Sequence, residues 1–155
     1  MSQLVELGLR DRVLAAYLRA ATRAWPWAPA VVLPVLARGR GRVWALVDGD
    51  AVLAGGLLSA APANLFLHPE RRRLARDYSA GGFVNLSYFV VRADRRGQGL
   101  GAAFIRAVAR EHSFWLACDP ELAGFYRRNG LAPSALDPAF HHSRPGHSTA
   151  LSLGQ

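Results

Sequence analysis

Apolar residues recur at helical spacing through the first part of the chain. Between about Leu4 and Ala24 these positions are Leu9, Val13, Leu14, Tyr17, Leu18 and Ala21. This spacing predicts an amphipathic helix. The segment "AWPWAPA" interrupts the pattern with Pro26 and Pro29, and "VVLPVLA" then predicts a short second helix. No clear strand precedes these helices unless "QLVEL" supplies one.

The pattern changes from helical to strand-like after the second helix. The segment "RVWALVDGDAVLAGGLLSA" has two apolar runs around Asp48-Gly49-Asp50, which predicts a β-hairpin. The following "PANLFLHPERRRLARDYSAGG" is interpreted as a connector that is partly helical through its arginine run.

The second half of the chain predicts strands and helices in alternation. The β-branched and aromatic run Phe83–Val91 has the length of a strand. A glycine-rich loop follows, and then a helix to about His112, with four residues expected to face the core: Leu100, Phe104, Ile105 and Val108. The segment "SFWLAC" predicts another short strand.

The last predicted helix has clear signals at both ends. Asp119 occupies an N-cap position and Pro120 the first helical position, and the helix runs to about Arg128. Gly130 follows as a C-cap glycine. The tail "HSTALSL" predicts a final strand. This order of elements indicates an α/β (α+β) fold around a central sheet.

Length and composition set the broad class of protein. The chain has 155 residues, of which 51% are hydrophobic, so we expect one domain spanning 1–155. A single cysteine, Cys118, excludes an internal disulfide framework and a cysteine-rich zinc site. No signal peptide or membrane-span pattern is evident, so we expect a cytoplasmic protein with no membrane partner and no metal.

The charge is unusual because all 19 basic residues are arginine and the net charge is +8. The absence of lysine excludes P-loop enzymes, Schiff-base enzymes and protein kinases, each of which needs a lysine. Arginine still suits phosphate recognition through its planar guanidinium. The charge therefore favours a polyanionic ligand, although arginine excess can also reflect the nucleotide composition of the gene.

Three glycines, Gly97, Gly99 and Gly101, stand at alternate positions before an apolar helix. Glycine is costly to order, so this cluster indicates close approach of a ligand, typically a phosphate at a helix N-terminus. A dinucleotide-binding loop is one interpretation, because G-x-G-x-x-G/A matches and Asp119 follows as a ribose-binding acid. However, "RADRR" separates the strand from the first glycine, and about 50 residues remain, too few for that fold. An ordinary tight turn is the second interpretation.

The third interpretation rests on two linked motifs. "VVRADRRGQGLGAAFI" resembles the acetyl-CoA-binding motif of the GNAT N-acyltransferase superfamily, through Arg96, Gly99 and Gly101. Downstream, "LAGFYRRNGL" resembles the family's second motif, an aromatic pair on a helix closed by a glycine. The resemblance covers about Val43 to Leu131. It implies a mixed, mostly antiparallel central sheet flanked by helices and splayed next to the cofactor loop.

The resemblance also implies the residues that bind acetyl-CoA, which would act as cosubstrate. Backbone N–H groups from Gly97 through Ala102 would hold the pyrophosphate. The preceding strand would pair with the pantetheine and polarise the acetyl carbonyl near Phe89. The residues expected to bind the cofactor are Phe89, Val90, Val91, Arg96, Gly97, Gln98, Gly99, Leu100, Gly101, Ala102, Asp119 and Tyr126. Arg96 can instead form a surface ion pair with Asp94.

Catalytic roles follow from the same resemblance. Tyr126 matches the tyrosine that protonates the departing CoA thiolate in many family members. Asn85 and Ser87 stand where some members carry a glutamate or histidine, so we expect them to hold a water molecule that relays the amine proton. By strand alternation, Asn85, Ser87, Phe89 and Val91 should share a face. His141 or His142 is an alternative base, although adjacent histidines on a loop are more often exposed.

The sequence departs from the family pattern at two positions. Leu131 replaces a common aromatic residue, and Asp119 stands where an asparagine often contacts pantetheine. Cys118 suggests a covalent acyl-enzyme, but the family transfers its acyl group directly, and a cysteine ending an apolar strand is usually buried and inert.

The expected function is transfer of an acetyl group from acetyl-CoA to a primary amine of a small molecule, an amino acid or a peptide N-terminus. Candidate walls of the acceptor site are Trp25, Trp27, Trp44, Phe140 and the two adjacent histidines. Few acidic residues occur near the N-terminus, which disfavours polycationic amines. Two alternatives stay open: a non-catalytic CoA-binding sensor or structural domain, and, less favoured, an arginine-rich nucleic-acid-binding module. We expect a monomer or homodimer.

Overall fold

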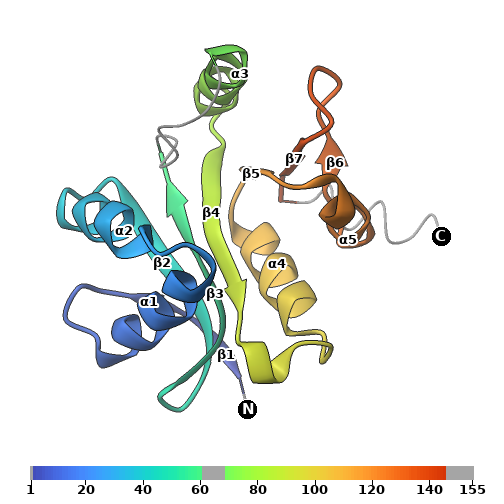
Figure 1. Ribbon diagram of the computed structural model, residues 1–155. Coiled ribbons are helices and arrows are strands. Elements are labelled where there is room, and N and C mark those ends of the chain that lie inside the picture. The colour runs from blue at the N-terminus through green and yellow to red at the C-terminus, as the bar shows by residue number, and fades with distance from the viewer. Residues whose placement is uncertain (1, 61–68, 146–155) are drawn as a thin grey trace.

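The computed structural model describes residues 2–60 and 69–145. Its first half contains strand β1 (Gln3–Leu7), helices α1 (Arg12–Ala24) and α2 (Ala28–Ala37), and the hairpin β2 (Gly41–Asp48) and β3 (Ala51–Ser59) (Figure 1). The hairpin is confirmed, and Gly49 at its turn has a φ of 60°, a left-handed conformation that favours glycine. The predicted second helix is confirmed as α2.

The second half begins with helix α3 (Pro69–Ala80), so the arginine run is helical as predicted. The remaining elements follow in the order β4 (Val84–Val91), η1 (Ala93–Arg95), α4 (Leu100–Glu111), β5 (Phe114–Ala117), η2 (Pro120–Leu122), α5 (Ala123–Arg128), β6 (Ala132–Pro133) and β7 (Phe140–Ser143). Gly130 has a φ of 93° and ends α5, with Leu131 N–H donating to the Tyr126 carbonyl.

The strands described in residues 2–60 and 69–145 form one sheet in the order β1-β2-β3-β4-β5-β7-β6. Neighbouring strands are antiparallel except β4 and β5, which are parallel. The expectation of a mixed, mostly antiparallel sheet flanked by helices is therefore confirmed. This topology also excludes the dinucleotide-binding interpretation, because that fold is built on a mostly parallel sheet with a different order.

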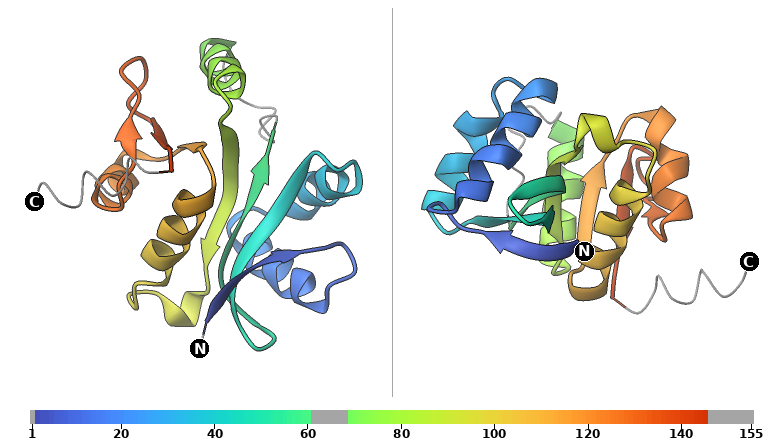
Figure 2. Two further views of the ribbon diagram at one scale, coloured as in Figure 1. Left: turned by 180° about the vertical axis from the view of Figure 1, so that it is seen from behind. Right: turned by 90° about the horizontal axis from the view of Figure 1, so that it is seen from below.

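Helices cover both faces of the sheet (Figure 2). On one face α1 and α2 pack through Leu14, Tyr17 and Val32 against β2 and β3. On the other face α4 packs against the sheet, and its fully buried residues are Phe104, Ile105 and Val108, as predicted. Leu100 is half-buried beside the same cluster. Burial of these apolar side chains on two faces is the main favourable contribution to folding.

Strand β4 contains a β-bulge. Its register with β3 shifts between Gly55 and Leu57, and Tyr88 lies there with a φ of 51°. A tyrosine in the left-handed region is strained and persists only where surrounding contacts hold it. The Tyr17 hydroxyl supplies one such contact, because it donates a hydrogen bond of 2.8 Å to the Tyr88 carbonyl.

The bulge overturns one prediction about the faces of β4. Leu86, Phe89 and Val91 pack on the α4 side, whereas Tyr88 and Val90 pack on the α1 side. An extra residue in the strand reverses the alternation, so Asn85 and Ser87 do not share a face with Phe89 and Val91 as we expected. Asn85 and Ser87 therefore face the α1 side.

Two further predictions of secondary structure were wrong. The first helix begins at Arg12 and not near Leu4, because Gln3–Leu7 pairs along its length with Val47–Val43 of β2. The alternative that "QLVEL" supplies a first strand is confirmed as β1. Residues 140–143 form strand β7 and not a loop, and His141 in it is fully buried. Pairing with β5 buries this polar-looking segment. The strand predicted for "HSTALSL" lies outside the described residues.

The bond between Tyr17 and Tyr88 should stabilise the whole domain. Tyr17 is fully buried, and the change Tyr17→Phe leaves the Tyr88 carbonyl without this donor. We expect the free energy of unfolding to fall by about 1–3 kcal/mol in urea denaturation.

Thr22→Ala is the matched control, because the Thr22 hydroxyl donates within α1 to the Leu18 carbonyl and ties no strand. We expect a smaller loss there. Equal stability of Tyr17→Phe and wild type would show that the bond does not hold the bulge.

Candidate active site

The sheet opens between β4 and β5. The two strands pair only at Val84 with Phe114 and at Asn85 with Trp115, and they diverge beyond these positions (Figure 1). The Asn85 amide closes the point of divergence by donating to the Trp115 carbonyl at 3.4 Å. Within the described residues, no strand pairs with this edge of β4 beyond Asn85. The backbone groups of this edge are therefore available to an extended ligand.

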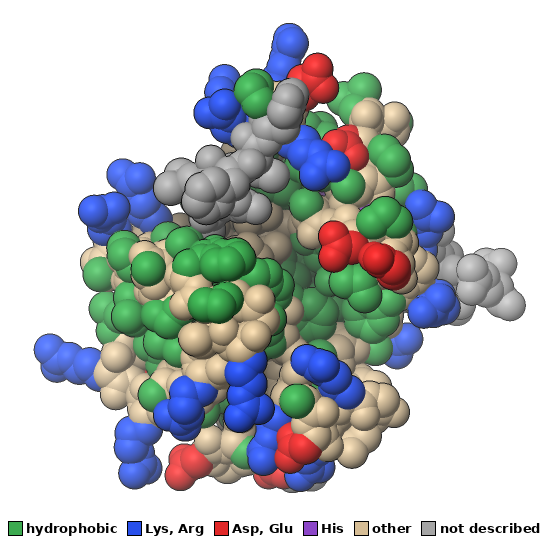
Figure 3. Space-filling view, in the orientation of Figure 1, with side chains coloured by type: hydrophobic (Ala, Val, Ile, Leu, Met, Phe, Trp, Pro, Cys, Tyr) green, Lys and Arg blue, Asp and Glu red, His purple; other side chains and the backbone are tan. Residues whose placement is uncertain are grey.

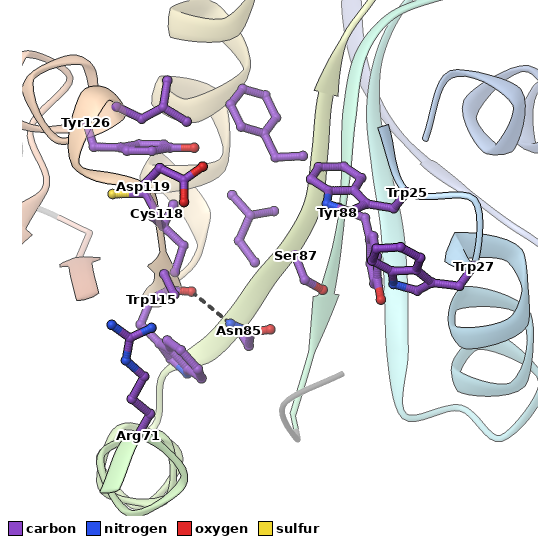
Figure 4. A pocket seen from close by; sticks show the side chains of 15 residues that line it. Trp25, Trp27, Arg71, Asn85, Ser87, Tyr88, Trp115, Cys118, Asp119 and Tyr126 are labelled. Carbon is purple, nitrogen blue, oxygen red and sulfur yellow. Dashed lines mark hydrogen bonds between the residues drawn. The ribbon is translucent and has the colours of Figure 1, made fainter. Parts of the chain in front are cut away.

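A cavity of about 510 Å³ lies at this opening. Side chains from the α1–α2 connection, α3, β4, β5 and α5 meet there (Figure 4). Its lining residues are Trp25, Trp27, Arg71, Asn85, Leu86, Ser87, Tyr88, Phe89, Trp115, Leu116, Ala117, Cys118, Asp119, Leu122 and Tyr126. A volume of this size suits a small substrate together with the reactive end of a cosubstrate.

The glycine-rich loop connects β4 to α4 through η1. Gly97 and Gly99 have φ values of 80° and 76°, which strongly favour glycine. Gly101, at the second position of α4, has a different constraint, because a Cβ there would lie 3.2 Å from Val91 Cγ2. The N–H of Ala103 donates to the Gly99 carbonyl, so α4 begins directly after the loop. The N–H groups before Ala103 lie at the start of the helix, where they can bind an anion.

Arginines surround this loop. Asp94 forms an ion pair with Arg92 at 2.7 Å. Its partner is therefore Arg92, and not Arg96 as the alternative role of Arg96 required. Arg95, Arg96, Arg127 and Arg128 are exposed. Figure 3 shows a hollow in the surface, and arginine side chains gather along the lower edge of the same face. Exposed arginines beside a helix N-terminus suit phosphate groups.

Tyr126 lies on α5 on the side of the cavity opposite α1, and its hydroxyl points toward the opening (Figure 4). The ring packs at 5.1 Å from Phe125 and 6.5 Å from Phe89, measured between ring centroids. Burial, with a smaller contribution from Cys118, raises the pKa of Tyr126 far above its ordinary value. The phenol therefore stays protonated at neutral pH and can donate a proton.

Asn85 and Ser87 line the cavity from β4, as the sequence predicted. The Asn85 amide is held by Trp115. The Ser87 hydroxyl oxygen is buried and has no hydrogen-bond partner among the described residues. Buried polar atoms are normally paired, so Ser87 is suited to bind a polar group or water from the cavity.

Cys118 and His141 form a contact at the wall of the cavity. The Cys118 Sγ lies 3.6 Å from His141 Nδ1. Burial and Asp119 raise the pKa of the Cys118 thiol, and Arg127 lowers it to a lesser degree. Burial and Arg127 lower the pKa of His141, and a hydrogen bond with the Ala139 backbone opposes part of that shift. Both groups therefore favour their neutral forms, which agrees with an unreactive cysteine and gives no thiolate for a covalent mechanism.

Two of the predicted acceptor walls lie at the cavity. Trp25 and Trp27 line it, and Trp25 packs edge-on against Tyr88 at 5.4 Å between centroids. Trp44 instead packs near His112 on the α4 side. Phe140 is buried against Trp115 at 5.1 Å, and His142 contacts the Tyr78 hydroxyl at 2.8 Å. His141 is buried behind the cavity wall, so neither histidine is an exposed loop residue.

Sequence reasoning missed Arg71, Tyr88 and Trp115. Arg71 lies in an arginine run that is typical of a solvent-exposed helix. Trp115 lies in an apolar strand, where a tryptophan is expected to be part of the core. Burial raises the pKa of Tyr88, and a hydrogen bond with the Trp27 side chain opposes part of that rise. The one available signal for Tyr88 was its place in the strand before the glycine loop, between Ser87 and Phe89.

The chain has the fold of the GNAT acyltransferase superfamily. A Brucella melitensis GNAT acetyltransferase in complex with acetyl-CoA superimposes with a TM-score of 0.62 at 18% identity, covering 94% of this chain and 89% of that one. Tetrahymena GCN5 superimposes with a TM-score of 0.64 at 9% identity, covering 95% of this chain and 97% of that one. A mutant AtaT toxin bound to acetyl-CoA and the C-terminus of antitoxin AtaR superimposes with a TM-score of 0.60 at 12% identity, covering 99% of this chain and 97% of that one.

No protein-family model matches the sequence, and no curated protein matches it. Among residues 2–60 and 69–145, no helix has the length and apolarity to cross a membrane. The same residues bring together no cluster of three or more histidine, cysteine, aspartate or glutamate side chains suited to a metal ion.

A substitution at Gly99 tests whether the glycine loop needs a left-handed backbone conformation there. A Cβ at Gly99 would meet no atom within 4 Å, so its left-handed φ alone explains the glycine. We expect Gly99→Ala to lower the free energy of unfolding by about 1–2 kcal/mol in urea denaturation.

Gly124→Ala is the control, because Gly124 lies inside α5 without a positive φ and its Cβ would face the flexible end of Arg128. There we expect unchanged or slightly higher stability. If Gly99→Ala matched wild type, the loop geometry described above would be wrong.

Proposed function

We propose that the protein is an acetyl-CoA-dependent N-acetyltransferase that acts on a primary amine of a small molecule, an amino acid or a peptide N-terminus. The observation that carries this proposal is the cavity between β4 and β5, lined by Tyr126 on one side and by Ser87 and Trp25 on the other (Figure 4). In this cavity a cosubstrate along the edge of β4 and an acceptor would meet at one point. The fold shared with acetyl-CoA complexes supports the assignment.

Acetyl-CoA suits the features on the α4 side. The N–H groups at the start of α4, between Gly97 and Ala102, would hold its pyrophosphate, aided by Arg96. The edge of β4 from Phe89 to Val91 would pair with the amides of pantetheine as an added strand. Asp119 lies near Tyr126 at the cavity and would contact the same arm.

The chemistry is direct transfer. The amine nitrogen attacks the thioester carbonyl carbon, the C–N bond forms and the C–S bond breaks. A backbone N–H near Phe89 would stabilise the developing oxyanion, because the bulge interrupts the ladder there. Ser87 and Asn85 would hold the water that takes the amine proton. Tyr126 would give its proton to the departing CoA sulfur.

A non-catalytic CoA-binding domain is the second candidate. Among the described residues that line the cavity, Asp119 is the only carboxylate and there is no histidine. A proton relay through water is weaker than a base of matched pKa. Such a domain would bind acetyl-CoA without releasing free CoA thiol in the presence of any amine, and a thiol assay distinguishes the two.

The Tyr126 hydroxyl gives the sharpest test of catalysis. Tyr126→Phe removes the proton donor and should lower kcat about 100-fold. Because burial raises the pKa of Tyr126, the phenol stays protonated as pH rises, and wild-type kcat should show no Tyr126-dependent fall between about pH 7 and about pH 9.

Tyr78→Phe is the control, since its hydroxyl contacts His142 outside the cavity lining. It should keep its turnover. Both variants should still be stabilised by acetyl-CoA in thermal unfolding, by about 2.7 kcal/mol at a hundred times Kd. Unchanged kcat in Tyr126→Phe across pH would remove Tyr126 from the mechanism.

A further inference from the structure

Arg71 places one cationic group at the end of the cavity beside Trp115, away from Tyr126 (Figure 4). It lies in the first turn of α3, the helix that precedes β4. Its guanidinium Nε donates to Asp137 Oδ2 at 3.1 Å, and its Cζ lies 5.8 Å from the centre of the Phe140 ring. Asp137 is itself fixed, because its Oδ1 accepts from the Ala139 N–H at 3.0 Å.

These contacts orient Arg71 without using all of its donors. The bond to Asp137 involves Nε, so the two Nη groups can make a bidentate pair with a carboxylate. The side chain is 44% exposed, and it lines the cavity beside Trp115 and Asn85 (Figure 4). A guanidinium held in one orientation loses less entropy when it binds an anion than a mobile one.

Aromatic side chains form another wall of the same cavity. Trp25, Trp27 and Tyr88 form the face opposite Tyr126, and Trp27 is 51% exposed although it is a large apolar side chain. Among the described lining residues, the carboxylate of Asp119 lies on the other side, beside Tyr126 (Figure 4). The cavity therefore has flat apolar walls on one side of β4 and, across β4 beside Trp115, the guanidinium of Arg71, which Asp137 pairs from outside the lining.

We propose that the acceptor is an amine that also carries a carboxylate and an aromatic ring, of which a free aromatic amino acid is the simplest form. Arg71 binds the carboxylate, the tryptophans and Tyr88 enclose the ring, and the amine lies toward Ser87. The proposal rests on the proposed acetyltransferase function and names its substrate class. A polyamine fits poorly, because the described lining residues offer its charges only one carboxylate, Asp119 beside Tyr126, and would bring them against Arg71.

Three acceptors with the same ring test whether the protein recognises the carboxylate: tryptophan carries it, tryptophanamide replaces it by an amide, and tryptamine lacks it. Each is assayed with acetyl-CoA by release of CoA thiol. Wild type should have the highest kcat/KM for tryptophan. Arg71→Gln should raise the KM for tryptophan about 10- to 100-fold, the loss expected for a charge-assisted hydrogen bond, and should leave the amide and tryptamine unchanged.

Arg73→Gln is the matched control, because Arg73 lies on the same helix and shares with Arg71 a second cavity beside Leu136 and Asp137, but does not line the cavity between β4 and β5. It should behave as wild type with all three acceptors. A purely structural Arg71 would change kcat for every acceptor alike, and that result would overturn the proposal. Equal use of tryptamine and tryptophan by wild type would also overturn it while leaving the acetyltransferase function intact.

Binding of the product gives a readout that does not need turnover. N-acetyltryptophan should stabilise wild type in thermal unfolding, and Arg71→Gln should lose that stabilisation but keep that from acetyl-CoA. If acetyl-CoA stabilises the protein and no amine is acetylated, the proposed function fails. If tryptamine is acetylated and N-acetyltryptophan does not bind, only the substrate class fails.

Discussion

The end of pairing between β4 and β5 is the constraint on which the site depends. The two strands are joined at Val84–Phe114 and Asn85–Trp115, and β5 then follows β7 on its other edge, from Phe114–Ser143 to Ala117–Phe140. The sheet therefore divides at one point into two parts. Helix α4 packs against one face of the sheet at that point, so core residues close the gap on this face. The gap stays open as a cavity away from α4.

The bulge at Tyr88 gives the two faces of β4 different roles. Before it, Asn85 and Ser87 face the side of α1 and α2, and after it, Phe89 and Val91 face α4. In the proposed reaction, residues on both faces of this strand would therefore contribute to one site. The buried bond from Tyr17 to the Tyr88 carbonyl links this local strain to the packing of α1.

Most of the fold could be predicted from the sequence, because its signals are local. The hairpin around Gly49, the left-handed glycines of the loop and the capping of α5 by Gly130 all follow from backbone requirements of glycine. Strand β1 could be named from the sequence only as a possibility, because a five-residue segment beside a helix gives a weak pattern and its pairing with β2 decides its structure. Strand β7 was missed because its histidines look polar, although His141 is buried by its neighbours.

The candidate site was predictable only in part. Ser87, Asn85 and Tyr126 line the cavity, and their chemical roles stay predictions. Arg71 could not be found, since an arginine on a charged helix gives no local sign that tertiary packing brings it to β4. The face assignments along β4 also failed, because a left-handed tyrosine has no sequence signature comparable to that of glycine.

Hydrogen–deuterium exchange with and without acetyl-CoA tests most directly whether the opening beside β4 is the cosubstrate site. We expect slower exchange for the amides of residues 86–91 and 97–103 when acetyl-CoA is bound, and no such protection with NADPH. If saturating acetyl-CoA leaves both segments unprotected, or if NADPH protects the loop instead, the opening beside β4 is not the acetyl-CoA site.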